Sequence, residues 1–365
     1  MRNLLNRIVP IFMIITLLFI TITGCSTQNT SANLEYYNKI DEVVSTYHDK
    51  GQFTGAVLVS KDGEVVYKKG FGTVEQKDLK IKNKPDTKFL LYSCTKQFTA
   101  MLTLQLVEKG KLNLEDKVTD ILEYIPEGDF NRDLGKITVY NLLTNTSGLS
   151  DYYRMIFSKL ASKAFTSEEI LNMLSKCKYS ITFEPGTKYS YSNTNFYLLG
   201  LIIEEITGKT YSEALEENIC KPLGMNNTGY TEKNIDFINF PFVHMENLYS
   251  AGGIYSTVED LHLWDLALYN DKLLSKEYRK IMFEPFRDNY ACGWAIEKNQ
   301  INGENKTHTY HSGAPTIGMR KAYIVRTLED KICVVILSNS GRIPTNMHND
   351  IYNILYDIKI DEKNE

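Results

Sequence analysis

A serine and a lysine three positions apart form the first candidate for chemistry. Ser93 lies where the strand-like stretch 88–92 gives way to a run of helical spacing, and Lys96 follows one turn later. The two side chains would share one helical face. A lysine in a partly dry site can lose its proton and activate a serine, and a helix start favours developing negative charge. Alone, such a pair is more often an N-cap serine and a surface lysine. The second S-x-x-K, at residues 175–178, lies in a charged stretch that indicates solvated surface.

Two later segments carry polar groups suited to the same cleft. Tyr191-Ser192-Asn193 follows a Pro-Gly turn signal and precedes the helical run 195–207. A phenol beside a lysine ammonium can exchange protons, and an asparagine can orient an amide. Taken alone, however, this segment is typical of a capped loop. His311-Ser312-Gly313 ends a strand candidate, whose edge could hold an extended substrate backbone, and Gly313 would let that backbone approach closely.

The elements that must position these groups are strands at both chain ends and helices between them. Period and turn signals, among them Asp62-Gly63 and Asn302-Gly303, predict strands at 53–60, 64–72, 293–299, 306–311, 319–326 and 332–337, and a final helix at 346–358. Helical spacing dominates from Ser93 to about residue 280, and Ser256 with Glu259 predicts a capping box. The terminal strands cannot bury their faces separately. We therefore expect an α+β fold, in which one antiparallel sheet flanked by helices is built from both ends and carries an all-helical inserted lobe.

In combination, the three motifs resemble a known family. Ser93-x-x-Lys96, Tyr191-x-Asn193 and His311-x-Gly313 are similar, in order and spacing, to the three boxes of serine β-lactamases and penicillin-recognising peptidases. The match is to the branch with class C β-lactamases, D-alanyl-D-alanine carboxypeptidases, D-aminopeptidases and related esterases. Flanking stretches resemble it as well; they are residues 142–149, 183–186, 251–257, 293–294 and 337–340. The resemblance covers roughly residues 35–358 and implies the β-lactamase/transpeptidase-like fold.

The resemblance also implies roles for individual residues. Ser93 would be the nucleophile, Lys96 and Tyr191 would share proton transfer, and Asn193 would orient the substrate amide. The backbone N–H groups of Ser93 and Ala314 would form the oxyanion hole. Tyr191 would activate the deacylating water. No cofactor and no metal are implied.

The third box departs from most β-lactamases, which have lysine where this chain has His311. A histidine with an ordinary pKa is mostly neutral at pH 7, so the substrate carboxylate would lose a fixed positive partner. This favours the peptidase and esterase members. Arg320, nine residues later, could supply the missing charge, or it could be a solvent-facing strand residue. Cys94, next to Ser93, would point away from it and pack.

The first 25 residues form a separate unit. Arg2 and Arg7 precede an apolar run from Ile8 to Ile22, as in an export signal. Thr23-Gly24-Cys25 resembles a bacterial lipobox, which predicts lipidation of Cys25; the alternative is an uncleaved anchor, although 15 residues are short for a span. We expect a signal peptide at 1–24, a lipidated tether at 25–34 and a hydrolase domain at 35–365, divided into an α/β lobe (about 35–100 and 285–365) and a helical lobe (about 101–284).

Composition excludes several classes of protein. The 365 residues contain 43% apolar and 24% charged residues with a net charge of −4, which is typical of a folded protein. No basic surplus is present to bind nucleic acid. The five cysteines after Cys25 form no C-x-x-C pair, which argues against a disulfide scaffold and a zinc cluster.

These patterns together predict a membrane-anchored, extracytoplasmic serine hydrolase. Its expected substrate is a D-amino-acid peptide of the cell-wall type. A β-lactamase or a small-ester esterase is the alternative within the enzyme class. A non-catalytic penicillin-binding or sensor lipoprotein is the alternative outside it.

Overall fold

The computed structural model describes most of the chain beyond the expected signal peptide. The described residues are 33–76, 79–125, 127–154, 163–176, 181–230, 244, 247–315, 319, 321–340 and 342–358. The predicted signal peptide, Cys25 and Arg320 lie outside these residues. Within them, no helix combines the length and the hydropathy that crossing a bilayer would require.

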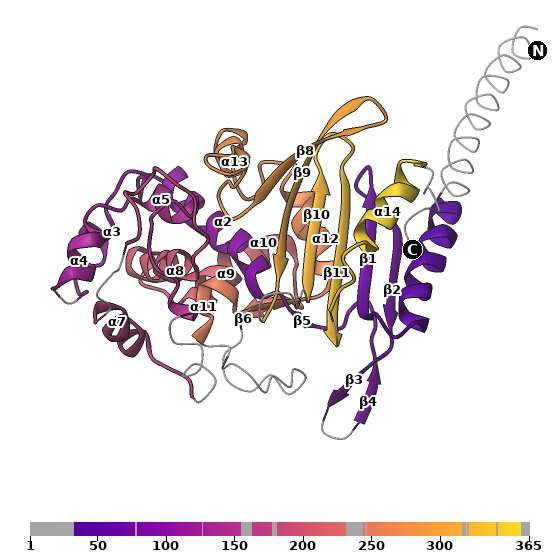
Figure 1. The fold of residues 1–365 in the computed structure, drawn as a ribbon, viewed down its shortest axis with the longest axis horizontal. Coiled ribbons are helices and arrows are strands. Elements are labelled where there is room, and N and C mark those ends of the chain that lie inside the picture. Colours follow the sequence, from indigo (N-terminus) through magenta and orange to yellow (C-terminus); the bar gives the residue numbers. More distant parts are fainter. Residues whose placement is uncertain are drawn as a thin grey trace, which may run out of the picture.

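A six-stranded antiparallel sheet joins the two ends of the chain, as the sequence predicts (Figure 1). Its strand order is β2 (Glu64–Phe71), β1 (Thr54–Lys61), β11 (Ile332–Ser340), β10 (Ala322–Thr327), β9 (Glu304–Gly313) and β8 (Ala295–Ile301). β1 and β11 pair in the middle, so residues nearly 280 positions apart are neighbours, such as Val57 and Ile336. β9 lies between β10 and β8, and residues 311–313 of its third box pair with β10 but lie beyond the end of the pairing with β8.

Two tight turns set the register of the outer hairpins. Asp62 and Gly63 join β1 to β2, and Asn302 and Gly303 join β8 to β9. All four residues have positive φ, between 52° and 83°. Two successive positive φ values define the type I′ turn, whose twist matches that of the flanking strands. The Asx-Gly dipeptides in the sequence therefore predicted both turns correctly.

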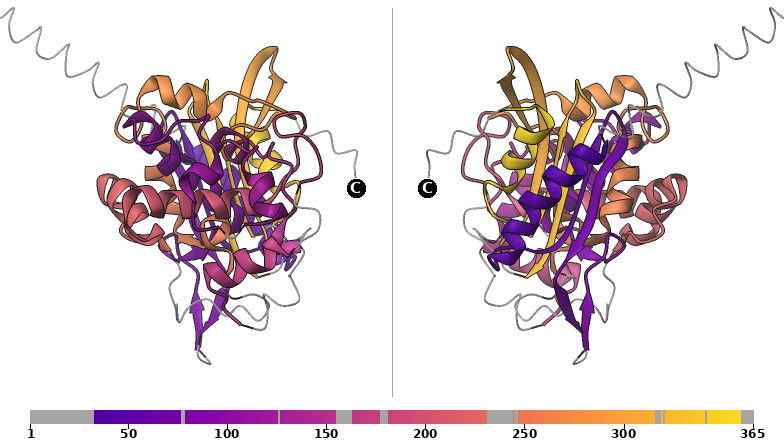
Figure 2. Two further views of the ribbon diagram at one scale, coloured as in Figure 1. Left: turned by 90° about the vertical axis from the view of Figure 1, so that its left-hand side faces the viewer. Right: turned by 90° about the vertical axis from the view of Figure 1, so that its right-hand side faces the viewer.

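Both faces of the sheet are covered, so its central strands are buried on both sides. Val57 and Val59 of β1 face a cluster with Ile40, Val44 and Ile351, which come from the helix at 33–49 and from α14 (Met347–Leu355). Figure 2 shows these two helices on the outer face. The alternate residues of β1 face the core that contains α2 (Thr95–Glu108) and α12 (Val258–Ala267).

The remaining helices of the described residues belong to the inserted segment, and most of them form a second lobe beside the sheet (Figure 1). They are α3 (Val118–Ile121), α4 (Asp129–Leu134), α5 (Val139–Leu143), α7 (Ser167–Ser175), α8 (Asn193–Thr207), α9 (Tyr211–Leu215), the π-helical turn η2 (Glu216–Cys220), α10 (Lys221–Leu223), α11 (Tyr249–Gly252) and α13 (Lys276–Phe283). α8 is almost entirely buried, because its apolar residues occupy more than one face. It is the central helix of this lobe.

The inserted segment differs from the all-helical expectation in one respect. A small sheet with the order β5 (Phe89–Leu90), β7 (Ile254–Ser256) and β6 (Gly229–Tyr230) includes two strands from it. These strands have two or three residues, too few for a period-2 pattern to be recognised. A further hairpin, β3 (Thr73–Gln76) and β4 (Leu79–Lys82), projects from the body and was not predicted.

Candidate active site

Ser93 lies in a turn between the small sheet and the first helix of the core. The 3-10 turn η1 (Tyr92–Cys94) connects β5 to α2. Tyr92 has a φ of 48°, a left-handed conformation that a bulky residue adopts at a cost of about 1–3 kcal/mol. The half-buried Ser93 is thereby placed just before the first turn of α2.

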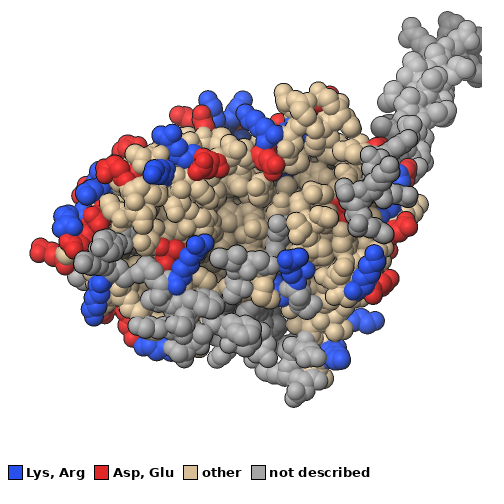
Figure 3. Space-filling view, viewed as in Figure 1, with Lys and Arg blue, Asp and Glu red and all other residues tan. Residues whose placement is uncertain are grey.

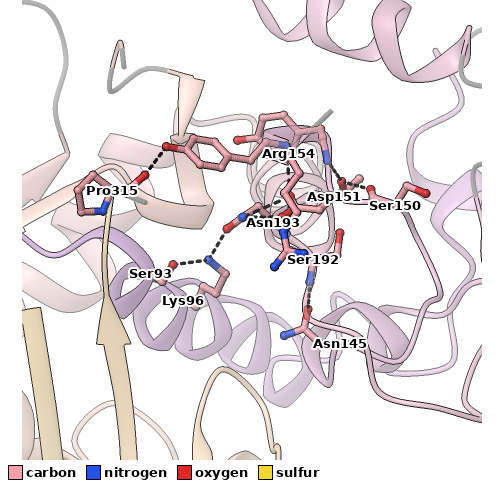
Figure 4. Close-up of polar contacts among 12 residues, drawn as sticks. Ser93, Lys96, Asn145, Ser150, Asp151, Arg154, Ser192, Asn193 and Pro315 are labelled. Carbon is pink, nitrogen blue, oxygen red and sulfur yellow. Dashed lines mark hydrogen bonds and ion pairs between the residues drawn. The ribbon is translucent and has the colours of Figure 1, made fainter. Parts of the chain in front are cut away.

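Lys96 is completely buried, and its ammonium nitrogen contacts three acceptors, of which those on Ser93 and Asn193 are drawn in Figure 4. Its Nζ lies 3.2 Å from Ser93 Oγ, 2.8 Å from Asn193 Oδ1 and 2.7 Å from the carbonyl oxygen of Ala251. The three predicted residues Ser93, Lys96 and Asn193 therefore meet at one atom. Ala251 belongs to α11, which gives the family-like stretch 251–257 a direct part in holding the lysine.

Burial changes the acid–base behaviour of Lys96. Desolvation lowers its pKa from 10.5 to about 7, although the nearby Asp151 carboxylate opposes the shift. The charged form loses hydration that the three hydrogen bonds replace only in part. A substantial fraction of Lys96 is consequently a free amine at neutral pH, and it lies within reach of the Ser93 hydroxyl proton.

Tyr191 lies above the same lysine. Lys96 Nζ is 4.9 Å from the centroid of the Tyr191 ring, and the phenol oxygen is buried without a hydrogen-bond partner among the described residues. Burial raises the pKa of Tyr191 far above its usual value, and the nearby Ser93 hydroxyl offsets this only in part. Desolvation therefore favours loss of the proton from the lysine over loss of the proton from the phenol.

The loop that carries Tyr191 and Asn193 is held by the family-like stretch 142–149. Asn145 accepts hydrogen bonds from the backbone N–H of Ser192 (3.2 Å) and from Asn195 Nδ2 (2.7 Å). Its own backbone oxygen accepts from the N–H of Ser190 at 2.9 Å. Asn145 has a φ of 54°, which asparagine tolerates better than most residues. This support fixes the start of α8.

Asp151 is a site residue that the sequence reasoning missed. Its Oδ1 accepts hydrogen bonds from the backbone N and from Nδ2 of Asn193, both at 3.2 Å. Figure 4 shows Ser93, Lys96, Asn193 and Asp151 in one connected row. The available signal was an aspartate directly after the stretch 142–149 and Ser150, but no sequence spacing connects it with Asn193.

His311 of β9 is buried and neutral. Its Nδ1–H donates to the carbonyl oxygen of Ser312 at 2.8 Å, and its Nε2 accepts from the Tyr290 hydroxyl at 3.3 Å. Burial, helped by the charge of Lys96, lowers the pKa of His311 to about 3. This network requires the tautomer with its proton on Nδ1. Tyr290, a second partner not found from the sequence, also stacks edge-on against Tyr191.

Gly313 brings the third box against the serine turn. A Cβ at this position would lie 2.0 Å from the carbonyl oxygen of Leu91 and 3.0 Å from Tyr92 Cβ. The close approach that the sequence indicated is thus an approach to the chain's own serine turn. Cys94 reinforces the contact, since its buried thiol lies 3.2 Å from the His311 carbonyl oxygen, which agrees with the packing expected of Cys94.

Ser312 and Ala314 lie half-buried at and just after the end of β9, beside the turn that carries Ser93. The next residue, Pro315, accepts a hydrogen bond from the Tyr153 hydroxyl at 2.7 Å. Tyr153 comes from the helical lobe and Pro315 from the sheet lobe, so this bond joins the two walls of the site. Arg320, the candidate for an added positive charge, is outside the described residues.

Comparison with known proteins agrees with this geometry. The family model described as Beta-lactamase matches residues 40–357. The chain belongs to the beta-lactamase family. This family comprises serine acyl hydrolases and includes penicillin-binding proteins, which agrees with the fold and with the resemblance that the three motifs indicated.

Individual members of the beta-lactamase family resemble this chain along most of its length. It is 29% identical to "Penicillin-binding protein 4*" of Bacillus subtilis over 82% of this chain and 71% of that protein. It is 30% identical to "Putative penicillin-binding protein PbpX" of the same species, over 70% of this chain and 65% of that protein. The octameric penicillin-binding protein homologue from Pyrococcus abyssi superposes with a TM-score of 0.72 and 28% identity, covering 87% and 77% of the two chains.

Proposed function

We propose that this protein hydrolyses acyl compounds through a covalent intermediate on Ser93, and that its natural substrates are D-amino-acid peptides of the cell-wall type. The observation that carries the proposal is the contact, at 3.2 Å, between the Ser93 hydroxyl and a buried Lys96 whose pKa of about 7 leaves a substantial fraction of free amine at neutral pH. A neutral amine at that distance is placed to act as a general base.

The proposed acylation step uses the groups that meet in the cleft. The Lys96 amine takes the Ser93 proton as Oγ bonds to the substrate carbonyl carbon. The N–H groups of Ser93 and Ala314 receive the charge that develops on the carbonyl oxygen. Tyr191, which keeps its proton, donates it to the leaving nitrogen as the C–N bond breaks, and regains a proton from the Lys96 ammonium. Water then releases the acyl group by the reverse sequence of proton transfers.

The neutral His311 of the third box guides the choice of substrate. A neutral His311 offers no fixed charge to a substrate carboxylate. Uncharged side chains also cover much of the centre of the face in Figure 3, with most charged ones toward its margins. These features support an amide substrate whose recognised part is uncharged. They support a small-ester esterase as the second candidate, because an ester needs no carboxylate partner.

The cellular location is part of the proposal. An export signal at 1–24 and lipidation of Cys25 would hold the domain outside the cytoplasm at the membrane, beside the cell wall. The relatives named as penicillin-binding proteins of Bacillus subtilis support a wall-type substrate, since penicillins mimic D-amino-acid peptides. Substrate peptide and lipid anchor are then the expected partners.

Intact-mass spectrometry tests the proposed chemistry. The domain from residue 34 onward is incubated with a penicillin while penicillin loss is followed in the same sample, and Ser93→Ala serves as the control. A lasting adduct absent from Ser93→Ala supports a slowly deacylating, peptidase-like enzyme. Rapid penicillin loss without an adduct would make it a β-lactamase. If neither occurs, D-aminopeptide amides and p-nitrophenyl esters are assayed next.

The same samples separate an enzyme from a sensor. A sensor lipoprotein would be acylated once and would turn over no amide or ester, with the adduct stable for hours. Turnover of any D-aminopeptide or ester that Ser93→Ala abolishes excludes this alternative. Residual hydrolysis by Ser93→Ala would instead show that Ser93 is not the nucleophile.

A further inference from the structure

The Asp151 carboxylate faces Asn193 of the site rather than solvent. Its side chain is 9% exposed. Oδ1 accepts from the backbone N of Asn193, from Asn193 Nδ2 and from the N–H of Tyr153, each at 3.2 Å, and Oδ2 accepts from Asn193 Nδ2, also at 3.2 Å. The exposed Arg154 lies 3.6 Å from Oδ2. The carboxylate therefore binds both the backbone and the side chain of Asn193.

This contact determines which end of the Asn193 amide faces Lys96. The amide has one donor end and one acceptor end, which can exchange places by rotation. With Nδ2 on the carboxylate, Oδ1 must face the lysine, as observed at 2.8 Å. In the flipped orientation, Oδ1 would face the carboxylate and Nδ2 would face the ammonium, so both interactions would become repulsive. A neutral partner at position 151 would not impose this preference.

We propose that Asp151 is the positioning residue of this site: it fixes the Asn193 amide, and through it Lys96, and it places a negative charge beside this pair. The inference rests on the proposed function of Ser93 and Lys96. It adds a residue from the helical lobe that contacts neither Ser93 nor the reacting atoms.

The charge balance around Lys96 supports this role. The titratable groups that face it are Asp151, Cys94, Tyr191 and His311. Burial keeps Tyr191 and His311 uncharged at neutral pH. Asp151 raises the pKa of Lys96 against the desolvation that lowers it, and Lys96 in turn lowers the pKa of Asp151 against its own desolvation. The two groups are thus coupled through Asn193.

A direct titration of Lys96 tests the proposal without any substrate. The protein is labelled with 13C at lysine Cε, and the Lys96 resonance, assigned with Lys96→Met, is followed by NMR across pH 5 to 10. In Asp151→Asn the midpoint should fall by about one pH unit, because an opposite charge close by is lost. Asp151→Glu should keep the midpoint near that of the wild type. An unchanged midpoint in Asp151→Asn would overturn the proposal.

A matched control removes a buried aspartate elsewhere. Asp260 of α12 accepts hydrogen bonds from the N–H of Asn227 and from Thr228 Oγ1, both at 2.8 Å. Asp260→Asn should lower the melting temperature and leave the Lys96 midpoint in place. A shift of equal size in Asp260→Asn would mean that general loosening moves the midpoint, and would overturn the assignment to Asp151. If Asp151→Asn does not fold, Asp151→Ser removes the same charge without added bulk.

Acylation kinetics supply the second readout. The rate of adduct formation with benzylpenicillin or p-nitrophenyl acetate should fall by up to about 100-fold in Asp151→Asn, since a misplaced amide misaligns the base. In the same variant, the acid limb of the pH–rate profile should move to lower pH together with the NMR midpoint. If Asp151→Asn kept the acylation rate and the acid limb of the wild type, the positioning role would be contradicted. Failure of the wild type to react with either probe would count against the proposed function, while the NMR midpoint still decides the role of Asp151.

Discussion

Lys96 shows how burial can turn a side chain that is normally charged into a base. Its amine has three hydrogen-bond acceptors at 2.7 to 3.2 Å and no exposed surface. Water would solvate the ammonium better than these neighbours do, so the proton is held less tightly than on a surface lysine. Because the pKa falls to about 7 rather than lower, both protonation states are accessible during a reaction cycle.

A Lys96 pKa of about 7 predicts the pH dependence of the reaction. As the pH rises through 7, Lys96 loses its proton and becomes able to accept the one on Ser93, so kcat/KM should rise with a single acid limb near pH 7. Burial lowers the pKa of His311 to about 3, so this residue should not contribute to the pH dependence in this range. A pH profile from 5 to 9 with p-nitrophenyl acetate measures the limb.

Lys96→Arg is the informative variant for this prediction. It keeps a positive charge but cannot deprotonate in this range, so activity should fall by at least about 1,000-fold at every pH, within the range of general-base contributions. An acid limb that stays near pH 7 in an active Lys96→Arg enzyme would assign the limb to another group.

Gly313 gives a prediction about packing at the serine turn. Gly313→Ala places a methyl group 2.0 Å from the Leu91 carbonyl oxygen, so β9 and the turn with Ser93 must separate. We expect a loss of about 1–3 kcal/mol in the free energy of unfolding, typical of overpacking, together with slower acylation. Urea unfolding and adduct formation measure the two effects.

Gly135→Ala is the matched control for this change. Gly135 has a φ of −62°, and the nearest atom to an added Cβ is 3.4 Å away. Gly135→Ala should measurably change neither the free energy of unfolding nor the rate of acylation. Equal effects of the two substitutions would show that the close approach at Gly313 has no special importance.

The sequence alone could relate site residues that lie close together along the chain. It could not relate residues that only the fold brings into contact. Ser93 and Lys96 share one turn of chain, and Tyr191 and Asn193 share one loop. Asp151 meets Asn193 across 42 residues, and Tyr153 meets Pro315 across 162. The chain contains 24 tyrosines. Without the fold, nothing distinguishes Tyr153 and Tyr290 from the others.

At the scale of elements, α12 and β10 are joined by a buried ion pair. Arg326 Nε donates to Asp265 Oδ1, and both side chains are at most 1% exposed. The guanidinium also lies 4.6 Å from the centroid of the Tyr269 ring. An intact buried ion pair adds little net stability to a fold. Loss of one partner is costly, however, because the other charge stays buried without a counter-charge.

Arg326→Met should therefore lower the free energy of unfolding by about 3–5 kcal/mol, because Asp265 stays buried without its partner. Lys68→Ala breaks the more exposed pair between Lys68 and Glu259, and should cost about 0–1 kcal/mol. Chemical denaturation of both variants measures the difference. Similar losses in the two would contradict the idea that burial decides the strength of these contacts.

Element boundaries were predictable where the signal was local and strong. Asp62-Gly63 and Asn302-Gly303 correctly located two hairpins, and the predicted helical run 195–207 ends where α8 does, before Gly208 with its φ of 65°. The start of α12 was placed one residue early, since Thr257 rather than Ser256 caps it by accepting from the N–H of Asp260. Ser256 lies in β7, where its hydroxyl contacts Thr228. Two adjacent hydroxyl residues could not be separated by pattern alone.

At the scale of the whole molecule, the sheet closes the chain on itself and the site forms where its two lobes meet. β1 and β11 pair along seven positions, so the ends of the domain are neighbours and the inserted helical lobe is held at its base. The helix at 33–49 packs on the outer sheet face through Ile40 and Val44. Its partner in this layer, α14, comes from the other end of the chain.

This arrangement would keep the proposed tether at 25–34 away from the site, because the first described helix lies on the sheet face opposite α2. If Cys25 carries the proposed lipid, Cys25→Ser should move the protein from the membrane fraction to the soluble extracytoplasmic fraction while penicillin labelling at Ser93 persists. Ser26→Ala, which keeps the cysteine, should stay with the membrane. Fractionation followed by immunoblotting distinguishes them. Membrane association that survives Cys25→Ser would mean that the apolar segment from Ile8 to Ile22 is retained as the anchor.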